Sequence, residues 1–449
     1  MRVVALVDGE HYPDVTRWAL AEAAAAGFRV EAALLIGGVE KLPAGGRLDV
    51  GDVPVRRADG DPMGALAAAL DEVRPEGVLD LSDAPVLAYE RRMEAAAVAL
   101  ARGVPYLGPD FRFDPPWTEP AIPPATVGVI GTGKRVAKTG VSGHLARLAA
   151  AEGLAPVVVA MGRGGPPSPV VAGPEDVTVD ALLARADRGE HAASDYLEDA
   201  LTAGVPTVGA RRAGGGMGGR PFATNAGEAA RVAAARGAGL VILEGSGASL
   251  PPVPWDAGVL VVPSSVPLAH VAGYGGPLRV LLSDLAILIM SPGPRAGTEN
   301  LSALDSHIRR LRPGIRIAHA VLDPVPLADV RDKDVFVATT AAGVSDWLVE
   351  RLERTAGCRV VGISARLADR AGLEEDLASA PRFDVLATEL KAAAVDVAAR
   401  RALERGAGVV FLDNRPRAVG GDGEVDDLLR EVAGLARERA AGRPERPAR

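Results

Sequence analysis

The sequence predicts an α/β protein with an N-terminal Rossmann-like parallel-sheet domain, a P-loop NTPase-like parallel α/β domain and a C-terminal α/β extension. Short apolar runs of strand length alternate with longer segments whose apolar residues recur every three or four positions. This alternation is typical of βαβ units and a parallel sheet. A length of 449 residues with 48% apolar residues is enough for two or three domains with substantial cores.

The first domain is expected over residues 1–119. Its strands are predicted at Val3–Val7, Ala32–Ile36 and Val78–Leu81. Three helices are predicted: the first ends at Ala26, and the others span Met63–Val73 and Pro85–Arg102. In a parallel sheet, the loops that follow the strands gather at the carboxyl edge, where ligands bind. A proline-rich segment at 114–124 then predicts a linker.

The second domain is expected over 120–345 and the third region over 346–449. The second contains predicted strands at Ala125–Ile130, Val157–Ala160, Thr207–Ala210, Leu240–Leu243, Leu285–Met290, Arg316–Leu322 and Val335–Ala338, with helices at Val141–Glu152 and Ser194–Leu201. The third contains predicted strands at Arg359–Ile363, Val385–Ala387 and Gly408–Leu412, with a helix at Val425–Arg437. These patterns do not decide whether the last strands extend the central sheet or form a separate layer.

A loop with the sequence GTGKRVAKT joins the strand at 125–130 to the helix at 141–152. We predict that it binds a nucleotide through Gly131, Thr132, Gly133, Lys134, Arg135, Val136, Ala137, Lys138 and Thr139. In a phosphate-binding loop, backbone N–H groups cradle phosphates, a lysine reaches the β- and γ-phosphates, and a Ser or Thr hydroxyl binds Mg²⁺. Lys138 and Thr139 have that order. Thr132 and Ala137 stand where the pattern GxxxxGK[ST] has glycine, so a basic surface turn remains the alternative.

A carboxylate follows the apolar run at 240–243. Glu244 begins the segment EGSGA, and a carboxylate at the end of a buried strand beside the loop strand is where nucleotide enzymes hold Mg²⁺. Capping of the next turn is the alternative role for Glu244.

Arginines set among glycines are the remaining candidate ligands. Arg163 follows the strand at 157–160, and Arg211, Arg212 and Arg220 flank the glycine-rich run after the strand at 207–210. Glycine permits close backbone approach, and a guanidinium binds phosphate through two parallel hydrogen bonds. A mobile surface loop with solvated arginines is the alternative.

Two further groups of polar residues lie near predicted strand ends. His11, beside Asp8 and Glu10, is placed either for substrate contact or for capping its turn. The helix at 194–201 carries Asp195, Glu198 and Asp199, which either supply a metal ligand and anchor the arginines or form a solvated face.

Composition excludes several classes of function. The net charge of −8 and an aromatic content of 4% argue against nucleic-acid binding. The single cysteine, Cys358, excludes an intramolecular disulfide and a multi-cysteine metal site. No signal region and no run of eighteen apolar residues is recognisable, so we expect no membrane segment and a cytoplasmic location.

Two motifs resemble those of dethiobiotin synthetases. GTGKRVAKT and EGSGA are similar to GTDTxVGKT and EGAGG of that family, with the same nine-residue loop. The resemblance implies that Lys138 is a phosphate ligand and that Thr139 and Glu244 are Mg²⁺ ligands. That family also has a lysine, aimed at the group being phosphorylated, where this chain has Arg163.

A wider resemblance covers most of the chain. In the same order, the motifs DGEHYP, IGGVEKL at 36–42, GTGKRVAKT, MGRGGP and RRAGGGMGG are similar to those of cyclic 2,3-diphosphoglycerate synthetases. The resemblance implies an ATP- and Mg²⁺-dependent ligase that closes 2,3-diphosphoglycerate into a phosphoanhydride. Lys138, Arg163 and Glu244 would then be catalytic, the substrate would be bound by Arg163, Arg211, Arg212, Arg220 and His11, and we expect a homodimer.

Two other functions share parts of this pattern. A dethiobiotin-type carboxylating ligase would use the same loop and Glu244, but its substrate does not require Arg211, Arg212 and Arg220. A nucleotide-gated metallochaperone or switch protein would use the loop, but the chain lacks a Cys-rich or His-rich motif for metal transfer.

Overall fold

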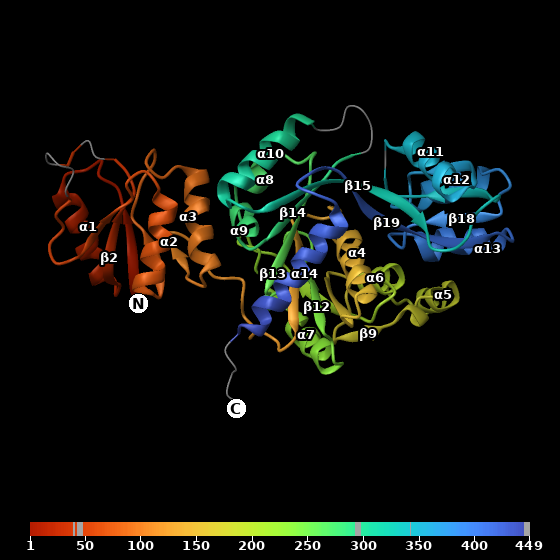
Figure 1. Ribbon diagram of the computed structural model, residues 1–449, viewed down its shortest axis with the longest axis horizontal. Helices are drawn as coiled ribbons and strands as arrows, with labels where there is room; N and C mark the ends of the chain where they lie inside the picture. The colour runs from red at the N-terminus through yellow and green to blue at the C-terminus, as the bar shows by residue number, and fades with distance from the viewer. Residues whose placement is uncertain (39–40, 43–47, 292–297, 342, 444–449) are drawn as a thin grey trace.

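The computed structural model describes residues 1–38, 41–42, 48–291, 298–341 and 343–443, arranged as three lobes, with the last helix, α14 (Val425–Ala441), returning to the central lobe (Figure 1). It is an α/β protein with large, mostly parallel sheets, so the predicted fold class is confirmed. Val39 and Glu40, which belong to the motif at 36–42, lie outside the described residues.

The N-terminal domain contains one sheet with the strand order β3-β2-β1-β4-β5-β6. β1 pairs in parallel with β2 and β4, which places the switch in strand order beside β1. Its elements are β1 (Arg2–Val7), α1 (Pro13–Ala25), β2 (Arg29–Leu35), β3 (Val55–Arg57), α2 (Pro62–Val73), β4 (Gly77–Asp80), α3 (Tyr89–Ala101), β5 (Tyr106–Leu107) and β6 (Arg112–Phe113).

The helix predicted to begin at Pro85 begins at Tyr89 instead. The backbone N–H of Asp83 donates to the carboxylate of Asp8 at 3.0 Å, and the N–H of Leu87 donates to the carbonyl of Asp83 at 3.0 Å. These bonds hold the preceding residues in a turn.

The central domain is built on β8, β12, β7, β13, β14 and β15, which run parallel in that spatial order. Its strands are β7 (Ala125–Gly131), β8 (Pro156–Gly162), β9 (Val170–Ala172), β10 (Thr207–Ala213), β11 (Ala223–Thr224), β12 (Leu240–Glu244), β13 (Ala257–Pro263), β14 (Leu285–Ile289) and β15 (Arg316–Pro326). Its helices are α4 (Lys138–Ala151), the 3₁₀ turn η1 (Pro174–Asp176), α5 (Val179–Asp187), α6 (Asp195–Ala203), α7 (Ala226–Ala235), α8 (Ala269–Ala272), α9 (Gly276–Leu281) and α10 (Thr298–Leu311).

Two expectations about this sheet are corrected. β13 was not predicted, although it is a short apolar run and lies directly beside β7. The strand that leads to Arg163, β8, pairs with β12 and β10 and is therefore one strand removed from β7 rather than beside it. β12, which ends at Glu244, does lie beside β7, as predicted.

The C-terminal strands join the central sheet through one long antiparallel pair. β19 pairs with β15 along 318–326 and then runs parallel to β18, which continues to β16 and β17. The strand at 334–338 thus belongs with the C-terminal strands by its pairing, while the domain boundaries expected after 119 and 345 stay predictions. The elements are β16 (Asp334–Ala338), α11 (Ser345–Ala356), β17 (Arg359–Ser364), α12 (Arg370–Ser379), β18 (Val385–Thr388), the π-helix η2 (Ala394–Ala399), α13 (Arg400–Glu404), β19 (Gly408–Gly421) and α14 (Val425–Ala441).

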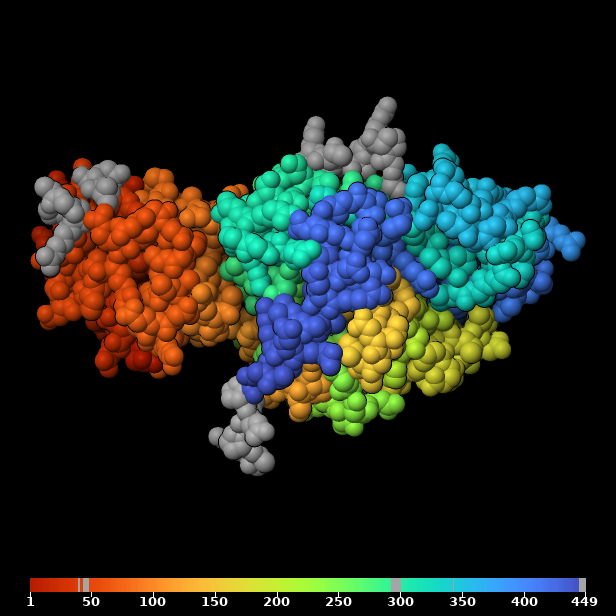
Figure 2. Space-filling model, viewed as in Figure 1, coloured from red at the N-terminus to blue at the C-terminus, as the bar shows by residue number. Residues whose placement is uncertain are grey.

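Helices cover both faces of the central sheet. α4 and α14 pack on one face, where Val127, Leu145 and Leu429 share a buried cluster. α9, α10 and the N-terminal domain's α3 pack on the other, where Leu100 and Leu278 share a second cluster. Figure 2 shows the C-terminal segment, in blue, lying across the front of the central domain. None of the helices in the described ranges combines the length and hydropathy that a bilayer crossing requires.

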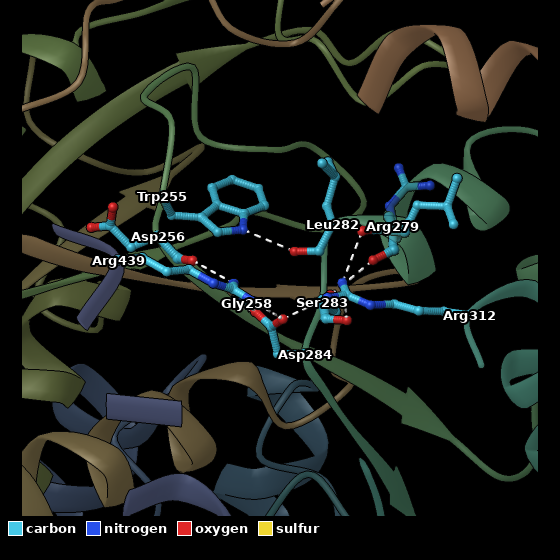
Figure 3. Close-up of polar contacts among 10 residues, drawn as sticks. Trp255, Asp256, Gly258, Arg279, Leu282, Ser283, Asp284, Arg312 and Arg439 are labelled. Atoms are coloured by element: carbon cyan, nitrogen blue, oxygen red, sulfur yellow. Dashed lines mark hydrogen bonds and ion pairs between the residues drawn. The ribbon is translucent and has the colours of Figure 1, made fainter. Parts of the chain in front are cut away.

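A polar network fixes α14 to the amino ends of β13 and β14 (Figure 3). Asp284 accepts hydrogen bonds from Arg312 at 2.5 Å, from two nitrogens of Arg439 at 3.0 Å each, and from the backbone N–H of Gly258 at 3.0 Å. Arg443 donates to Asp256 from Nε at 2.7 Å. The network lies at the opposite end of the strands from the predicted nucleotide loop, so it serves the fold rather than the site.

Replacing Asp284 by Asn should lower stability without affecting the nucleotide site. The amide keeps the shape but leaves Arg312 and Arg439 without a counter-charge, and because both arginines are partly exposed we expect a loss of about 2 to 4 kcal/mol. Thermal unfolding would report it as a fall of several degrees in Tm. The control is Glu350→Gln, which removes an exposed pair with Arg354 and should change stability by less than about 0.5 kcal/mol. Equal losses for both variants would contradict this role for Asp284.

Candidate active site

The predicted nucleotide loop connects β7 to α4, which begins at Lys138. Gly131 is required by packing, because a Cβ there would lie 2.6 Å from Val136 Cγ2 and 3.1 Å from the carbonyl oxygen of Val261. The loop closes on its own lysine, since Lys138 Nζ donates to the carbonyl of Gly133 at 2.8 Å. Strand, glycine-containing turn and helix therefore follow one another as a phosphate-binding loop requires.

Ala137 adopts the backbone conformation that glycine usually supplies. Its φ is +73° and its ψ is 19°, in the left-handed region, and Arg135 also has a positive φ of 56°. A Cβ in this region costs about 1 kcal/mol or more. The departure from the loop pattern is thus a strained alanine in a loop-like backbone rather than a different backbone.

Lys138 is buried among groups of both signs. Burial lowers its pKa to about 8, Glu244 and Asp195 favour the charged form, and Arg279 and Arg212 oppose it. An anionic ligand beside the ammonium would restore the full charge.

Two carboxylates lie behind the loop. Glu244, at the end of β12, accepts a hydrogen bond from Thr139 Oγ1 at 2.8 Å. Ser142 on α4 donates toward Asp199 at 3.2 Å and toward Glu244 at 3.3 Å. Burial raises the pKa of both Asp199 and Glu244, and the nearby charge of Glu244 raises that of Asp199 further.

These oxygens fit a hard divalent cation. Thr139, Glu244 and Asp199 offer hydroxyl and carboxylate donors, and Asp199 Oδ2 is buried without a hydrogen-bond partner. In the described ranges, no three His, Cys, Asp or Glu side chains are grouped as a closed metal cage. A Mg²⁺ ion bound mainly by phosphates and water needs only one or two such protein ligands.

A cavity of about 820 Å³ opens in front of the loop, between the central domain and the C-terminal lobe. Lys138, Thr139, Arg163, Asp195 and Glu244 line it from the central domain. The C-terminal lobe lines it with residues that follow β16 and β18, Thr340, Glu389 and Lys391, and with Asn414 of β19.

The C-terminal lobe contributes a hydrogen-bonded group of polar side chains. Glu389 accepts from Thr340 Oγ1 at 3.0 Å and from Asn414 Nδ2 at 2.9 Å. Lys391 crosses the cavity to Glu198 on α6, with 3.0 Å between Nζ and Oε1. Burial opposes the charge of Lys391, but Glu198 and Glu389 outweigh it and raise its pKa. Glu198 and Asp199 of the helix at 195–203 are therefore buried in the interior, whereas Asp195 is exposed.

The structure brings some predicted ligands together and leaves others apart. Arg163 lies in the cavity wall with Lys138, Thr139 and Glu244. Arg211 and Arg220 are exposed and do not line the cavity, and Arg211 Nε donates to the carbonyl of Gly165 at 2.5 Å.

Arg212 and His11 also lie outside the cavity wall. Arg212 is buried, 8% exposed, behind the loop that follows β12. His11 is exposed on the N-terminal domain, after β1. Roles for Arg211, Arg220 and His11 in substrate binding stay predictions.

Several residues in or near the site carried no recognisable sequence signal. Asn414 lies inside a strand run, and Arg279 lies in a short helix with no motif around it. Lys391 had one weak signal, since it is one of only five lysines in an arginine-rich chain.

Comparisons with known proteins agree along the whole chain. Family models for the N-terminal, P-loop and C-terminal domains of cyclic 2,3-diphosphoglycerate synthetase match residues 2–114, 126–321 and 326–415. Proteins named cyclic 2,3-diphosphoglycerate synthetase from Rubrobacter xylanophilus and Methanothermobacter thermautotrophicus are 44% and 41% identical to this chain. The first alignment covers 99% of this chain and 100% of the relative, and the second covers 96% and 95%. A protein of the same name from Thermococcus gammatolerans is 41% identical over 95% of this chain and 96% of its own.

Replacing Ala137 by Gly should relieve strain in the loop. Because the backbone already has a left-handed conformation, we expect stability to rise by up to about 1 kcal/mol and ATP to bind at least as tightly. Thermal unfolding and titration calorimetry measure the two effects. Ala146→Gly, in the interior of α4, is the matched control and should lose about 1 kcal/mol or more. A large loss of ATP affinity in Ala137→Gly would show that the loop needs the alanine.

The pH dependence of stability should change when Glu198 is replaced by Gln. Burial raises the pKa of Glu198 to about 7, against attraction by Lys391 and with repulsion from Asp195 and Glu389. Between about pH 4.5 and 7 the folded protein therefore holds a proton that the unfolded chain has released, and stability falls as pH rises. From pH 5 to 8 the Tm of the wild type should fall by a few degrees relative to Glu198→Gln. Glu404→Gln, half-exposed on α13, should follow the wild type; parallel curves for all three proteins would refute the assignment.

Proposed function

The chain belongs to the cyclic 2,3-diphosphoglycerate synthetase family, and we propose that it uses ATP to close 2,3-diphosphoglycerate into its intramolecular phosphoanhydride, with release of ADP and phosphate. It is an enzyme of the synthetase type with a P-loop domain. The observation that carries the proposal is the convergence of Lys138, Thr139, Glu244 and Arg163 on one cavity, closed on its other side by Lys391.

The loop and its lysine bind the nucleotide phosphates. Backbone N–H groups of 131–139 and the N-terminus of α4 are directed at the phosphate position, and Lys138 exchanges its bond with the Gly133 carbonyl for a phosphate oxygen. Thr139 and Glu244 are the residues that would hold Mg²⁺, which neutralises charge on the transferred phosphoryl group when bound.

The reaction then needs two displacements at phosphorus. The γ-phosphoryl group moves to one phosphate of the substrate, which forms a new P–O–P bond and releases ADP. An oxygen of the second substrate phosphate then attacks the phosphorus of the first substrate phosphate, to which the γ-phosphoryl group is now attached. The former γ-phosphoryl group leaves as inorganic phosphate, and the ring closes. Both reacting phosphates belong to one three-carbon frame, so positioning removes most of the entropic barrier.

Cations make this approach of phosphates feasible. Two phosphates a few ångströms apart repel strongly, and fixed positive groups in a water-poor cavity offset that repulsion. Arg163 and Lys138 lie on the central side of the cavity, and Lys391 lies on the C-terminal side. Glu198 holds Lys391 in place, at 3.0 Å, and so sets the distance between the two sides.

Lys138→Ala should abolish formation of the cyclic product while leaving the fold intact. The lysine is the only ammonium in the loop helix and faces the transferred phosphate, so we expect a loss of turnover of about a hundredfold or more. Phosphorus NMR of ATP, Mg²⁺ and 2,3-diphosphoglycerate with purified protein follows both ATP consumption and the cyclic anhydride.

The matched control is Lys333→Ala, an exposed lysine of the C-terminal lobe that donates to the Asp329 carbonyl at 3.1 Å. It should leave turnover unchanged. ATP consumption at the wild-type rate by Lys138→Ala would overturn the loop assignment. A wild-type protein that consumes ATP with this substrate but yields no cyclic anhydride would overturn the proposed reaction.

A further inference from the structure

Two arginines of the central domain are buried without a carboxylate partner among the described residues. Arg279 on α9 is 4% exposed and Arg212 on β10 is 8% exposed. Arg279 donates from Nη2 to the carbonyl of Ala248, and Arg212 donates from Nη1 to the carbonyl of Gly214 at 2.7 Å. The Nε atoms of both side chains are buried with no hydrogen-bond partner. Proteins rarely keep buried charges in this state unless a ligand completes them.

Two other partly buried arginines in the described ranges are paired with carboxylates. Arg147 contacts Asp413 at 2.9 Å, and Arg312 contacts Asp284 at 2.5 Å. Figure 3 shows the guanidinium of Arg279 turned away from Asp284 and Arg312, although all three residues lie in one region. The missing partner is therefore a property of Arg279 and Arg212 and not of arginines in this domain.

Glycine backbones surround the two guanidinium groups. A Cβ on Gly247 would lie 3.2 Å from Arg212 Nη2, and one on Gly215 would lie 3.6 Å from Arg212 Nη1. A Cβ on Gly219 would lie 3.4 Å from Arg279 Nη2, and one on Gly275 would lie 2.9 Å from Arg279 Nη1. We call these two arginines and four glycines the arginine pocket. It is formed by β10, by the loops that follow β10 and β12, and by the start of α9, which follows β13. This is the carboxyl edge of the sheet, where ligands of open α/β folds bind.

The arginine pocket adjoins the nucleotide loop. Gly247 also approaches Lys134 of the loop, since its Cβ would lie 3.6 Å from Lys134 Cγ. Both arginines are close enough to lower the pKa of Lys138. Burial alone lowers the pKa of Arg279 to about 10, because no carboxylate opposes it, but the guanidinium stays charged at neutral pH. A phosphate dianion matches two such groups in charge and in bidentate geometry.

We propose that the arginine pocket binds one phosphate group of the substrate through Arg212 and Arg279, next to the nucleotide loop, and that it selects a bisphosphate over a monophosphate. The identity of the ligand rests on the proposed function, whereas the anion-binding role of the pocket does not. Arg279 is a residue that the glycine-rich arginine motif at 211–220 did not reveal, because it comes from a helix about sixty residues later in the chain.

The test compares ligand binding and stability in Arg279→Met, Arg279→Lys and wild type. Met fills the same volume without charge, so removal of an unpaired buried charge should leave the Tm of the free protein equal or higher. In calorimetry without ATP, Arg279→Met should bind 2,3-diphosphoglycerate about ten- to hundredfold more weakly, close to the affinity for 3-phosphoglycerate. Arg279→Lys keeps the positive charge but cannot form two parallel hydrogen bonds to one phosphate, so it should also bind 2,3-diphosphoglycerate more weakly. This second variant keeps the test valid if the Met variant does not fold.

Arg312→Met is the matched control, because it removes a paired arginine from the same region. It should lower the Tm of the free protein and leave the affinity for 2,3-diphosphoglycerate unchanged. Wild-type affinity and a wild-type KM for 2,3-diphosphoglycerate in both Arg279 variants would overturn the arginine pocket and leave the proposed function standing.

Inorganic phosphate separates the pocket from the reaction. Millimolar phosphate should raise the Tm of the wild type and have no effect on Arg279→Met. If phosphate raises the Tm of the wild type but not of Arg279→Met, and the wild type forms no cyclic product, the arginine pocket is supported as an anion site while the proposed function fails. A phosphate effect that is equal in wild type and Arg279→Met would overturn the pocket.

Discussion

The antiparallel pairing of β15 with β19 is the constraint on which the site depends. It joins the parallel strands of the central domain to those of the C-terminal lobe and thereby fixes both carboxyl edges around one cavity. The contact is tight at the nucleotide loop, because a Cβ on Gly140 of α4 would lie 2.6 Å from the carbonyl oxygen of Asn414 on β19. Arg147 on α4 reinforces it through Asp413 at 2.9 Å. The C-terminal lobe therefore has a set position relative to Lys138, and Lys391 can act at the same ligand.

Among the described residues, the buried charged side chains around Lys138 lack partners that a bound polyanion and its metal ion would supply. Asp199 and Glu244 are buried together behind the nucleotide loop, and Arg212 and Arg279 are buried close enough to Lys138 to affect its pKa. Each group alone is unfavourable in the free protein, since burial raises the pKa of the acids and lowers that of Lys138. A cation at the carboxylates and phosphates at the cationic side would remove both penalties at once. The free energy held in these unpaired groups becomes available to bind a polyanion with its metal ion.

Sequence reasoning identified the half of the site that is encoded locally. The loop at 131–139 and Glu244 were found because each is a short motif at the end of an apolar strand run, and β12 does lie beside β7. Lys391, Asn414 and Arg279 were missed because their place in the site depends on pairings between distant segments, above all β15 with β19. β13 was missed because a seven-residue apolar run has no periodicity that separates it from loop or helix. β8 was placed beside β7, but β12 lies between them, so Arg163 is one strand further away than predicted.

The N-terminal domain has a structural part in the same arrangement. Its helix α3 packs against α9, the helix that carries Arg279, through the cluster that includes Leu100 and Leu278. Glu94 on α3 is 2% exposed and pairs with Arg310 of α10 at 2.6 Å, so the contact is both apolar and ionic. Met217 and Gly218 of the glycine-rich loop share a depression with Leu100 and Leu278. Because α3 packs against α9 and beside the glycine-rich loop, it can hold the guanidinium of Arg279 in place although that group has no carboxylate partner among the described residues.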